Sequence, residues 1–384
     1  MIEKNKSNEF SEPFTNSAEL GIVSQKDYFD REVVNQENLD GYYIVRNDDF
    51  VYNPRISVTA PVGPINRNRL GRNGVMSPLY TVFRTHGIDN LYLEFYFKTT
   101  SWHRFMKLNG DSGARFDRFT ISSTQFMEMP IPFPNKEEQR KIGEHFDNLD
   151  HFITLHQRKY DEMKQLKKFM LQKMFPKSGE LIPEIRFAGF TGDWEQHKLG
   201  EITNILSASR VHKEEWKTEG VPFFRSSDVM AAFKGTKNDK VFISQELFEK
   251  LSAISGKPQQ GDIFITGGGS IGTPYIVPNN EPLYSKDADL IWVKKGEKHD
   301  SFYLYSYFVS PIFREYLLSI SHTGTIAHYT IEQVKKTPVF FPSLEEQQKI
   351  GVYFSNLDHL ITLHQHKCDE LQGVKKFMLQ NMFV

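Results

Sequence analysis

A 39-residue stretch that occurs twice constrains the fold of this 384-residue chain more than any other feature. Residues 137–175 read EEQRKIGEHFDNLDHFITLHQRKYDEMKQLKKFMLQKMF, and residues 345–383 read EEQQKIGVYFSNLDHLITLHQHKCDELQGVKKFMLQNMF. The copies lie 208 residues apart and are identical at 27 of 39 positions without a gap. A period this long excludes a solenoid and predicts a duplicated two-part unit.

Each copy is predicted to form one long helix. Its large or apolar residues recur in alternating steps of four and three, which is typical of the seam of a coiled coil. The first seam consists of Ile142, Phe146, Leu149, Ile153, His156, Tyr160, Met163, Lys167, Met170 and Met174. The second consists of Ile350, Phe354, Leu357, Ile361, His364, Cys368, Leu371, Lys375, Met378 and Met382.

One helix alone cannot bury such a seam, so the two copies are predicted to pack on each other, antiparallel, with pseudo-twofold symmetry. His156 and His364 at mid-seam allow a metal or pH-sensitive site, but a polar layer that fixes the register is favoured. Lys167 and Lys375 are expected to reach out to solvent near the seam ends. Cys368, the single cysteine, is expected to be buried, and disulfides and cysteine-rich metal sites are excluded.

The rest of the chain repeats more loosely, which predicts a mixed α/β (α+β) protein with two diverged globular domains joined by the helices. The expected domains are 1–134 and 177–342, and the expected spacer helices are 135–176 and 343–384. Matching segments begin at Asp49 and Asp262, Asp89 and Asp300, Ser112 and Thr323, and Met129 and Thr337. Strands are predicted at 77–83 and 129–134, and one or two helices at 90–106. The leader at 182–202 has no counterpart in the first domain, which is therefore expected to be short at its N-terminus.

Composition and charge give weaker guidance. No apolar run approaches 18 residues and the N-terminus is polar, which predicts a soluble, cytoplasmic protein. The net charge is −1, yet residues 1–51 carry 5 basic and 11 acidic side chains, whereas residues 52–118 carry 10 and 4. Eight of those ten basic residues are arginines, which suit phosphates and guanine edges. A basic face or an ordinary solvated face explains this distribution equally well.

Motifs for catalysis are missing from the sequence. It has no phosphate-binding G-x-x-x-x-G-K-[ST], no H-E-x-x-H and no G-x-S-x-G. The run GGGSIG at 267–272 is followed by Pro274 rather than by a helical pattern, so a tight turn or a nucleic-acid-facing loop is favoured over a nucleotide-binding loop. The histidines at 151, 156, 359 and 364 lie five residues apart in each copy, which is not a metal-ligand spacing. An active site within this chain is therefore not expected.

Several motifs together resemble the specificity subunit of a type I restriction–modification system. They are the leader IPEIRFAGFTGDW, the helix starts at 133–143 and 341–351, the shared tail KKFMLQ-x-MF, and GDIFITGGGSIG at 261–272. The resemblance covers essentially the whole chain. It implies two target-recognition domains, each reading one half of a bipartite site in double-stranded DNA, and two helices that set the spacer and dock two methyltransferase subunits. It implies no catalysis and no cofactor in this chain, because S-adenosylmethionine, ATP and Mg belong to partner subunits, including the restriction and translocase subunits. No membrane partner is implied.

Base edges are then expected to be read by loop side chains in the major groove, while phosphate contacts position them. Each candidate competes with an ordinary surface or turn role. The candidates of the first domain are Arg55, Ser57, Arg67, Arg69, Arg72, Arg115 and Arg118. Those of the second domain are Arg225, Ser226, Lys234, Thr266, Ser270 and His328. Charge reversal at Arg67 and Arg69 is expected to weaken recognition of one half-site alone.

Two other classes of function compete with DNA recognition. The first is a non-catalytic coiled-coil scaffold that tethers two partners without reading DNA. Binding to DNA that weakens steeply with salt separates it from a recognition subunit. The second is a cryptic nuclease or methyltransferase, for which turnover by the purified chain alone is the test.

Overall fold

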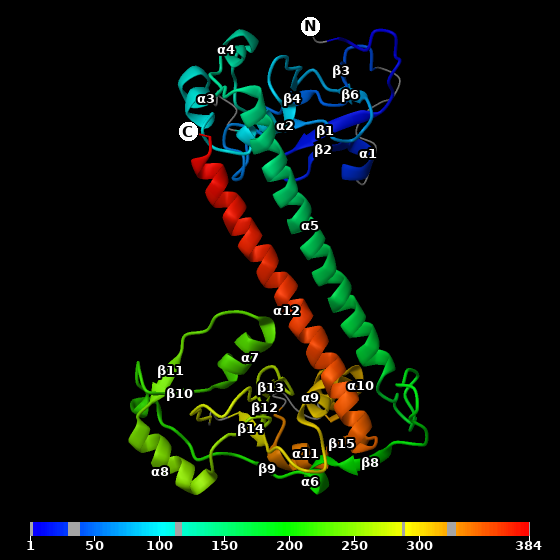
Figure 1. Ribbon diagram of the computed structural model, residues 1–384, viewed down its shortest axis with the longest axis vertical. Coiled ribbons are helices and arrows are strands. Elements are labelled where there is room, and N and C mark those ends of the chain that lie inside the picture. The colour runs from blue at the N-terminus through cyan, green and yellow to red at the C-terminus, as the bar shows by residue number, and fades with distance from the viewer. Residues whose placement is uncertain (1–2, 30–38, 112–116, 286–288, 321–327, 384) are drawn as a thin grey trace. The chain divides into compact units, whose positions relative to one another are not determined.

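The computed structural model describes residues 3–29, 39–111, 117–285, 289–320 and 328–383. The chain divides into two compact units (Figure 1). Unit 1 comprises Met1–Gln157 and His366–Val384, and unit 2 comprises Arg158–Gln365. Two long helices, α5 (Lys136–Lys173) and α12 (Leu344–Asn381), each contribute to both units. Within the described residues, no helix is long and apolar enough to cross a membrane.

Unit 1 contains two small sheets. The first has the strand order β2-β1-β6-β3, and the second is the antiparallel sheet β5-β4-β7. The strands are β1 (Pro13–Ser17), β2 (Gly21–Ser24), β3 (Tyr43–Val45), β4 (Phe50–Tyr52), β5 (Ile65–Arg67), β6 (Gly74–Met76) and β7 (Thr81–Phe83). The helices that precede α5 are α1 (Gln25–Tyr28), α2 (Asn90–Phe97), α3 (His103–Asn109) and α4 (Ser123–Met127).

Unit 2 is built around the antiparallel sheet β13-β12-β14-β9, with the smaller pairs β10-β11 and β15-β8. Its strands are β8 (Glu195–Lys198), β9 (Ile205–Leu206), β10 (Val221–Phe223), β11 (Val241–Ile243), β12 (Ile263–Thr266), β13 (Pro274–Ile276), β14 (Leu290–Val293) and β15 (Pro338–Phe341). Its helices before α12 are α6 (Leu199–Ile202), α7 (Ser226–Lys234), α8 (Gln245–Ser255), α9 (Ser301–Val309), α10 (Pro311–Ile320) and α11 (Ile331–Lys336), with the 3₁₀ turn η1 (Lys213–Glu215).

The predicted helices and their seam are confirmed. Asn135 and Ser343 cap the two helix starts, since their side-chain oxygens accept from the backbone N–H of Glu138 and Glu346. Every seam residue except Met382 is buried or half-buried. The seam provides the apolar stripe that each helix buries.

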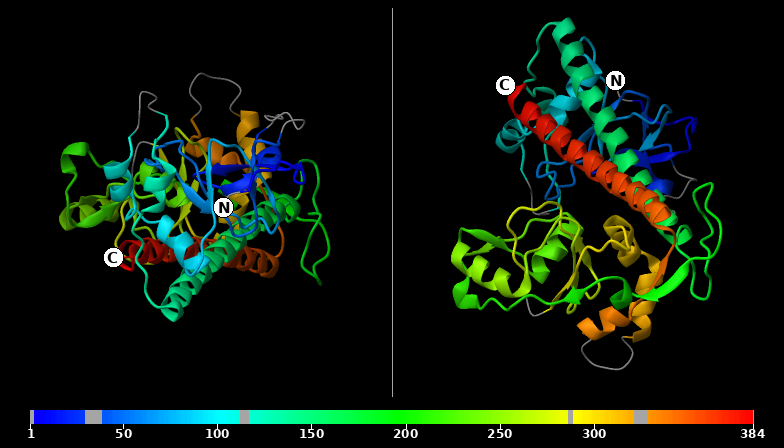
Figure 2. Two further views of the ribbon diagram at one scale, coloured as in Figure 1. Left: turned by 90° about the horizontal axis from the view of Figure 1, so that it is seen from above. Right: turned by 60° about the horizontal axis from the view of Figure 1, so that its bottom comes forward.

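The two helices pair in antiparallel directions within each unit (Figures 1 and 2). In unit 1 the Lys375 ammonium forms an ion pair with Asp150, and the buried Cys368 lies against the carbonyl of Ile153. In unit 2 the Nζ of Lys167 lies 2.5 Å from the carboxylate of Asp358. The two ion pairs correspond to each other at the repeat offset of 208. The prediction that both lysines reach out to solvent is therefore wrong, because an aspartate on the other helix offers each ammonium a partner.

Aromatic contacts repeat at the same offset. In unit 1, Phe383 stacks on Phe146 with ring centroids 5.8 Å apart and an interplanar angle of 24°. In unit 2, Phe175 stacks on Phe354 at 6.2 Å and 22°. The end of each long helix thus places a phenylalanine against the start of the other.

The globular parts also meet the helices in one repeated way. Asp89 caps α2 and donates its backbone N–H to Gln139 of α5, while Asp300 caps α9 and donates to Gln347 of α12. The strand that follows Asp49 is β4, the middle strand of its sheet, and the strand that follows Asp262 is β12, an inner strand of its sheet. The predicted correspondence of these segments is confirmed. The paired segments that begin at Ser112 and Thr323 lie for the most part outside the described residues.

The strand predicted at 129–134 is wrong. Its counterpart β15 pairs along its full length with β8, which belongs to the leader of the second domain. Within the described residues of unit 1, no strand plays the part of β8, and three of the six residues are prolines without an N–H. The segment is held instead by the hydroxyls of Tyr92 and Tyr96, which donate to the carbonyls of Pro132 and Pro130.

Candidate functional site

Two of the predicted residues of unit 1 come together beyond the end of β4. Arg55 and Arg118 face each other as an antiparallel bridge, supported by the N–H of Phe119, which donates to Pro54 O at 2.7 Å. Ser57 opens the adjoining turn and accepts from the backbone N–H of Ala60. Arg55 and Ser57 are exposed and Arg118 is half-buried. This loop edge therefore offers two guanidinium groups and one hydroxyl to a ligand.

Arg67 and Arg69 form part of the fold instead. The Nε of Arg67 lies 3.0 Å from Asp48 and 3.6 Å from Glu94, whose side chain is 9% exposed. Arg69 donates to Glu94 and to Asp147 of α5, both at 2.8 Å. These carboxylates neutralise both arginines and tie β5 to α2 and α5. Their predicted contact with DNA stays a prediction, and sequence reasoning missed the acidic partners because they come from three separate segments of the chain.

Arg72 and Arg225 also form ion pairs with carboxylates of the same unit. Arg72 makes two 2.8 Å hydrogen bonds to Glu12, and the hydrogen bond from Arg72 lowers the pKa of Glu12. Arg225 lies 3.0 Å from Asp228 and stacks 5.6 Å over the ring of Trp216. The Arg72 side chain is nevertheless 48% exposed, whereas that of Arg225 is 16% exposed. Arg115 lies outside the described residues.

Lys234 and Ser226 stand at opposite ends of α7. Ser226 begins the helix and is half-buried, whereas Lys234 is exposed at its last residue. Gly235 then ends the helix with φ +66, the left-handed conformation that glycine adopts without strain. Lys234 is thus available to a ligand.

In unit 2, residues 267–272 join β12 to its antiparallel neighbour β13. They form a tight hairpin connection and not the strand-to-helix turn of a nucleotide-binding fold. Gly272 has φ +73, and a Cβ there would lie 2.3 Å from Leu317. A Cβ on Gly268 would lie 2.6 Å from the carboxylate of Asp289. The glycines are required because the loop lies tightly against the rest of the unit.

Thr266 supports this loop from inside. It is fully buried, and its hydroxyl donates to Ser270 O at 2.5 Å and accepts from the N–H of Thr273. Thr266 therefore presents no atom at the surface, and its predicted role in binding DNA stays a prediction. Ser270 itself is exposed at the tip of the loop.

His328 and Arg314 lie beside the same loop. The Nδ1 of exposed His328 is 3.6 Å from Asp289, whose backbone carbonyl accepts from Gly267. Arg314 donates to Ile271 O at 3.1 Å, and burial lowers the pKa of its guanidinium. Within the described part of the chain, no carboxylate forms an ion pair with Arg314. Sequence reasoning missed Arg314, although it is the one cation in the helix PIFREYLLSI.

The repeated scaffold can now be compared with known proteins. The family model described as the type I restriction modification DNA specificity domain matches residues 12–165 and 191–372, far more than half of the chain. The chain belongs to this family. The two matched segments correspond to the two halves of the internal repeat, so each half is one specificity domain.

Two relatives of this specificity-domain protein are themselves specificity subunits or putative specificity subunits. The specificity subunit of the type I restriction enzyme MjaVIII of Methanocaldococcus jannaschii is 24% identical over 329 residues, which are 80% of this chain and 73% of that protein. A putative specificity subunit of Haemophilus influenzae, S.HindORF215P, is 25% identical over 252 residues, which are 64% of this chain and 60% of that protein. The match therefore spans about three fifths of the Haemophilus relative.

The crystal structure of the S subunit of a type I restriction–modification system from M. genitalium has a TM-score of 0.51 to this chain. The superposition covers 100% of this chain and 92% of that one, at 14% sequence identity. A likeness at this identity concerns the fold alone. It confirms the predicted fold class, a mixed α and β protein with an internal repeat and two long helices.

Proposed function

We propose that the chain is the non-catalytic subunit that selects the DNA sequence for a type I restriction–modification complex, with each unit reading one half of a bipartite target. DNA specificity follows from the family. The observation that carries the two-part reading is that one scaffold occurs twice while its exposed loops differ. Arg55, Ser57 and Arg118 border the loop edge of unit 1. Ser270, Arg314 and His328 border that of unit 2.

The helix pair is proposed to dock two methyltransferase subunits. Support comes from large apolar side chains that are exposed although each immediately precedes a seam residue. They form two matching sets at the offset of 208. The set in unit 1 is Phe152, Leu155, Val374 and Phe377, and the set in unit 2 is Leu360, Leu363, Leu166 and Phe169. Exposed apolar groups at equivalent places suit two copies of one partner.

The proposal places S-adenosylmethionine, ATP and Mg in partner subunits. Support comes from the lack of any nucleotide-binding motif in the sequence. Among the described residues, no group of His, Cys, Asp and Glu is placed to hold a metal ion.

Sequencing of methylated sites in cells that carry this chain and its partner subunits tests the proposal. Replacing Arg55 and Arg118 by alanine should relax the base preference in one half of the target. Replacing Ser270 and His328 should relax it in the other half. Equal loss in both halves, or DNA binding by the complex that does not weaken with salt, would contradict modular recognition.

A further inference from the structure

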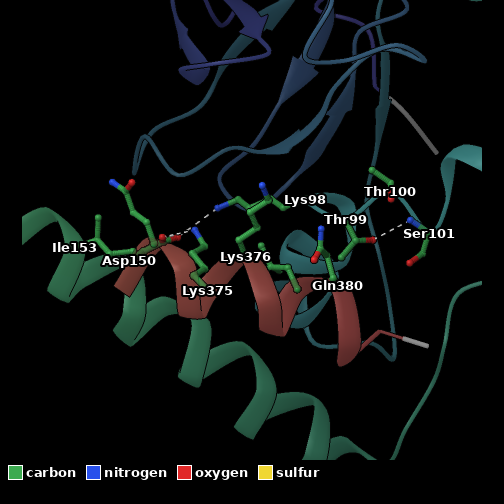
Figure 3. Close-up of a pocket in the computed structure, with 11 residues that line it drawn as sticks. Lys98, Thr99, Thr100, Ser101, Asp150, Ile153, Lys375, Lys376 and Gln380 are labelled. Atoms are coloured by element: carbon green, nitrogen blue, oxygen red, sulfur yellow. Dashed lines mark hydrogen bonds and ion pairs between the residues drawn. The ribbon is translucent and has the colours of Figure 1, made fainter. Parts of the chain in front are cut away.

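Unit 1 contains a cavity of about 470 Å³ between the turn that follows α2 and the two long helices. Lys98, Thr100 and Ser101 line it on one side, while Asp150 of α5 and Lys375, Lys376 and Gln380 of α12 line the other (Figure 3).

The cavity carries an excess of positive charge. Among the described residues that line it are three ammonium groups but one carboxylate, that of Asp150. Asp150 already pairs with Lys375 and lies 3.6 Å from the Nζ of Lys98. The other carboxylate near Lys98, Glu94, is 3.5 Å away and is shared with two arginines. In the described part of the chain, no ion pair involves Lys376.

The corresponding place in unit 2 shows that the scaffold does not need this charge. Counted from the caps Asp89 and Asp300, Lys98 corresponds to Val309 and Glu94 corresponds to Tyr305. The helix residues are retained there as Asp358, Lys167 and Lys168. Unit 1 thus carries a lysine and a glutamate where unit 2 carries a valine and a tyrosine, so the shared fold does not itself require the charge of Lys98.

The ligand that fits is a compact anion with several acceptor oxygens. Burial, and then the charge of Lys98, lower the pKa of Lys375, so an added anion would stabilise its charged form. Hydroxyl and amide donors from Thr100 and Gln380 complete the lining. We propose that this cavity binds a phosphate group, held by Lys98, Lys375 and Lys376.

The phosphate can come from the DNA backbone or from a small phosphate compound, and two measurements on the full chain distinguish these sources. The first is calorimetric titration of the chain with tripolyphosphate. The second is the dependence of DNA affinity on salt concentration for the complex with its partner subunits.

Lys376→Gln is the main variant, because this exposed side chain supports no ion pair and its loss should not disturb folding. Lys98→Val installs the residue of unit 2 and is a second, independent variant. The matched control is Lys168→Gln, which changes the equivalent exposed lysine of α5. Unaltered methylated sequences would show that target recognition is intact in each variant.

If the ligand is a small phosphate compound, tripolyphosphate should bind the unaltered chain. Lys376→Gln and Lys98→Val should each lower the affinity for tripolyphosphate about tenfold. Lys168→Gln should have no effect. If the phosphate belongs to the DNA backbone, Lys376→Gln should reduce the slope of the logarithm of DNA affinity against the logarithm of salt concentration by about one. The proposal is overturned if tripolyphosphate fails to bind and the slope is unchanged, or if Lys168→Gln acts as strongly as Lys376→Gln.

Discussion

Arg67 illustrates an arginine whose acidic partners could not be read from the sequence. Its side chain is 16% exposed and lies between Asp48 and Glu94. Arg67→Glu would place three carboxylates together at a half-buried site. We expect the free energy of unfolding of unit 1 to fall by roughly 3 kcal/mol. Urea unfolding followed by circular dichroism measures it.

Arg55→Glu is the matched control for that substitution. Arg55 is exposed and has no carboxylate partner within the described residues, so its reversal should change stability by less than about 0.5 kcal/mol. It should weaken recognition of one half-site instead. Equal stability of the two variants would show that the acidic partners of Arg67 do not hold the fold together.

His299 should make unit 2 sensitive to mild acid. Burial lowers the pKa of this imidazole from 6.5 to about 4. The unfolded chain therefore takes up a proton at a higher pH than the folded chain does, and stability falls as the pH drops from about 6.5 to about 4. The expected loss is up to roughly 3 kcal/mol. His299→Asn should flatten this part of a plot of unfolding free energy against pH, and an unchanged slope would assign it to other groups.

The helices cross their globular neighbours at two glycines, and substitution should reveal how closely each pair packs. A Cβ on Gly351 of α12 would lie 2.3 Å from the Asp300 carboxylate that caps α9. A Cβ on Gly143 of α5 would lie 3.0 Å from the N–H nitrogen of Tyr92. Gly351→Ala should cost about 2 kcal/mol and Gly143→Ala about 1 kcal/mol. Thermal unfolding ranks the two variants.

Gly373 provides the control within α12. No atom of the described residues lies within 4 Å of a Cβ added there, so Gly373→Ala should raise stability by up to about 1 kcal/mol through helix propensity alone. If all three substitutions had the same effect, close packing at the crossings would not be the cause.

At the scale of elements, the sequence predicted what periodicity controls. Both long helices, their seam and the burial of Cys368 follow from the spacing of apolar residues. The strand prediction at 129–134 failed because a strand needs a partner strand. The partner of the equivalent β15 is β8, which comes from a leader far away in the sequence. The burial of Thr266 could not be predicted for a related reason, since it depends on how residues 267–272 fold back over this side chain. Composition alone did not reveal which arginines meet carboxylates, because Glu94 and Asp147 are distant in sequence from Arg69.

At the scale of the whole molecule, the proposed spacer role predicts an effect of helix length. Deleting residues 154–160 and 362–368 removes one heptad from each helix and keeps the seam in register. Each helix becomes about 10 Å shorter, which corresponds to about three base pairs of DNA. Sequenced methylation sites should then keep their bases and lose about three positions from the spacer. An unchanged spacer would refute the proposed role of the helices.

The two interhelical ion pairs carry a further consequence for how the chain finds its own partner helix. Each long helix bears one aspartate and one lysine at equivalent places, Asp150 with Lys167 and Asp358 with Lys375. In an antiparallel pairing of two α5 helices from different chains, Asp150 of each helix would meet Lys167 of the other, so these ion pairs alone do not distinguish that pairing from the internal one. Because α5 and α12 belong to one chain, their high effective concentration favours pairing within the chain. Pairing between helices of two chains is therefore expected only where newly made chains are highly concentrated.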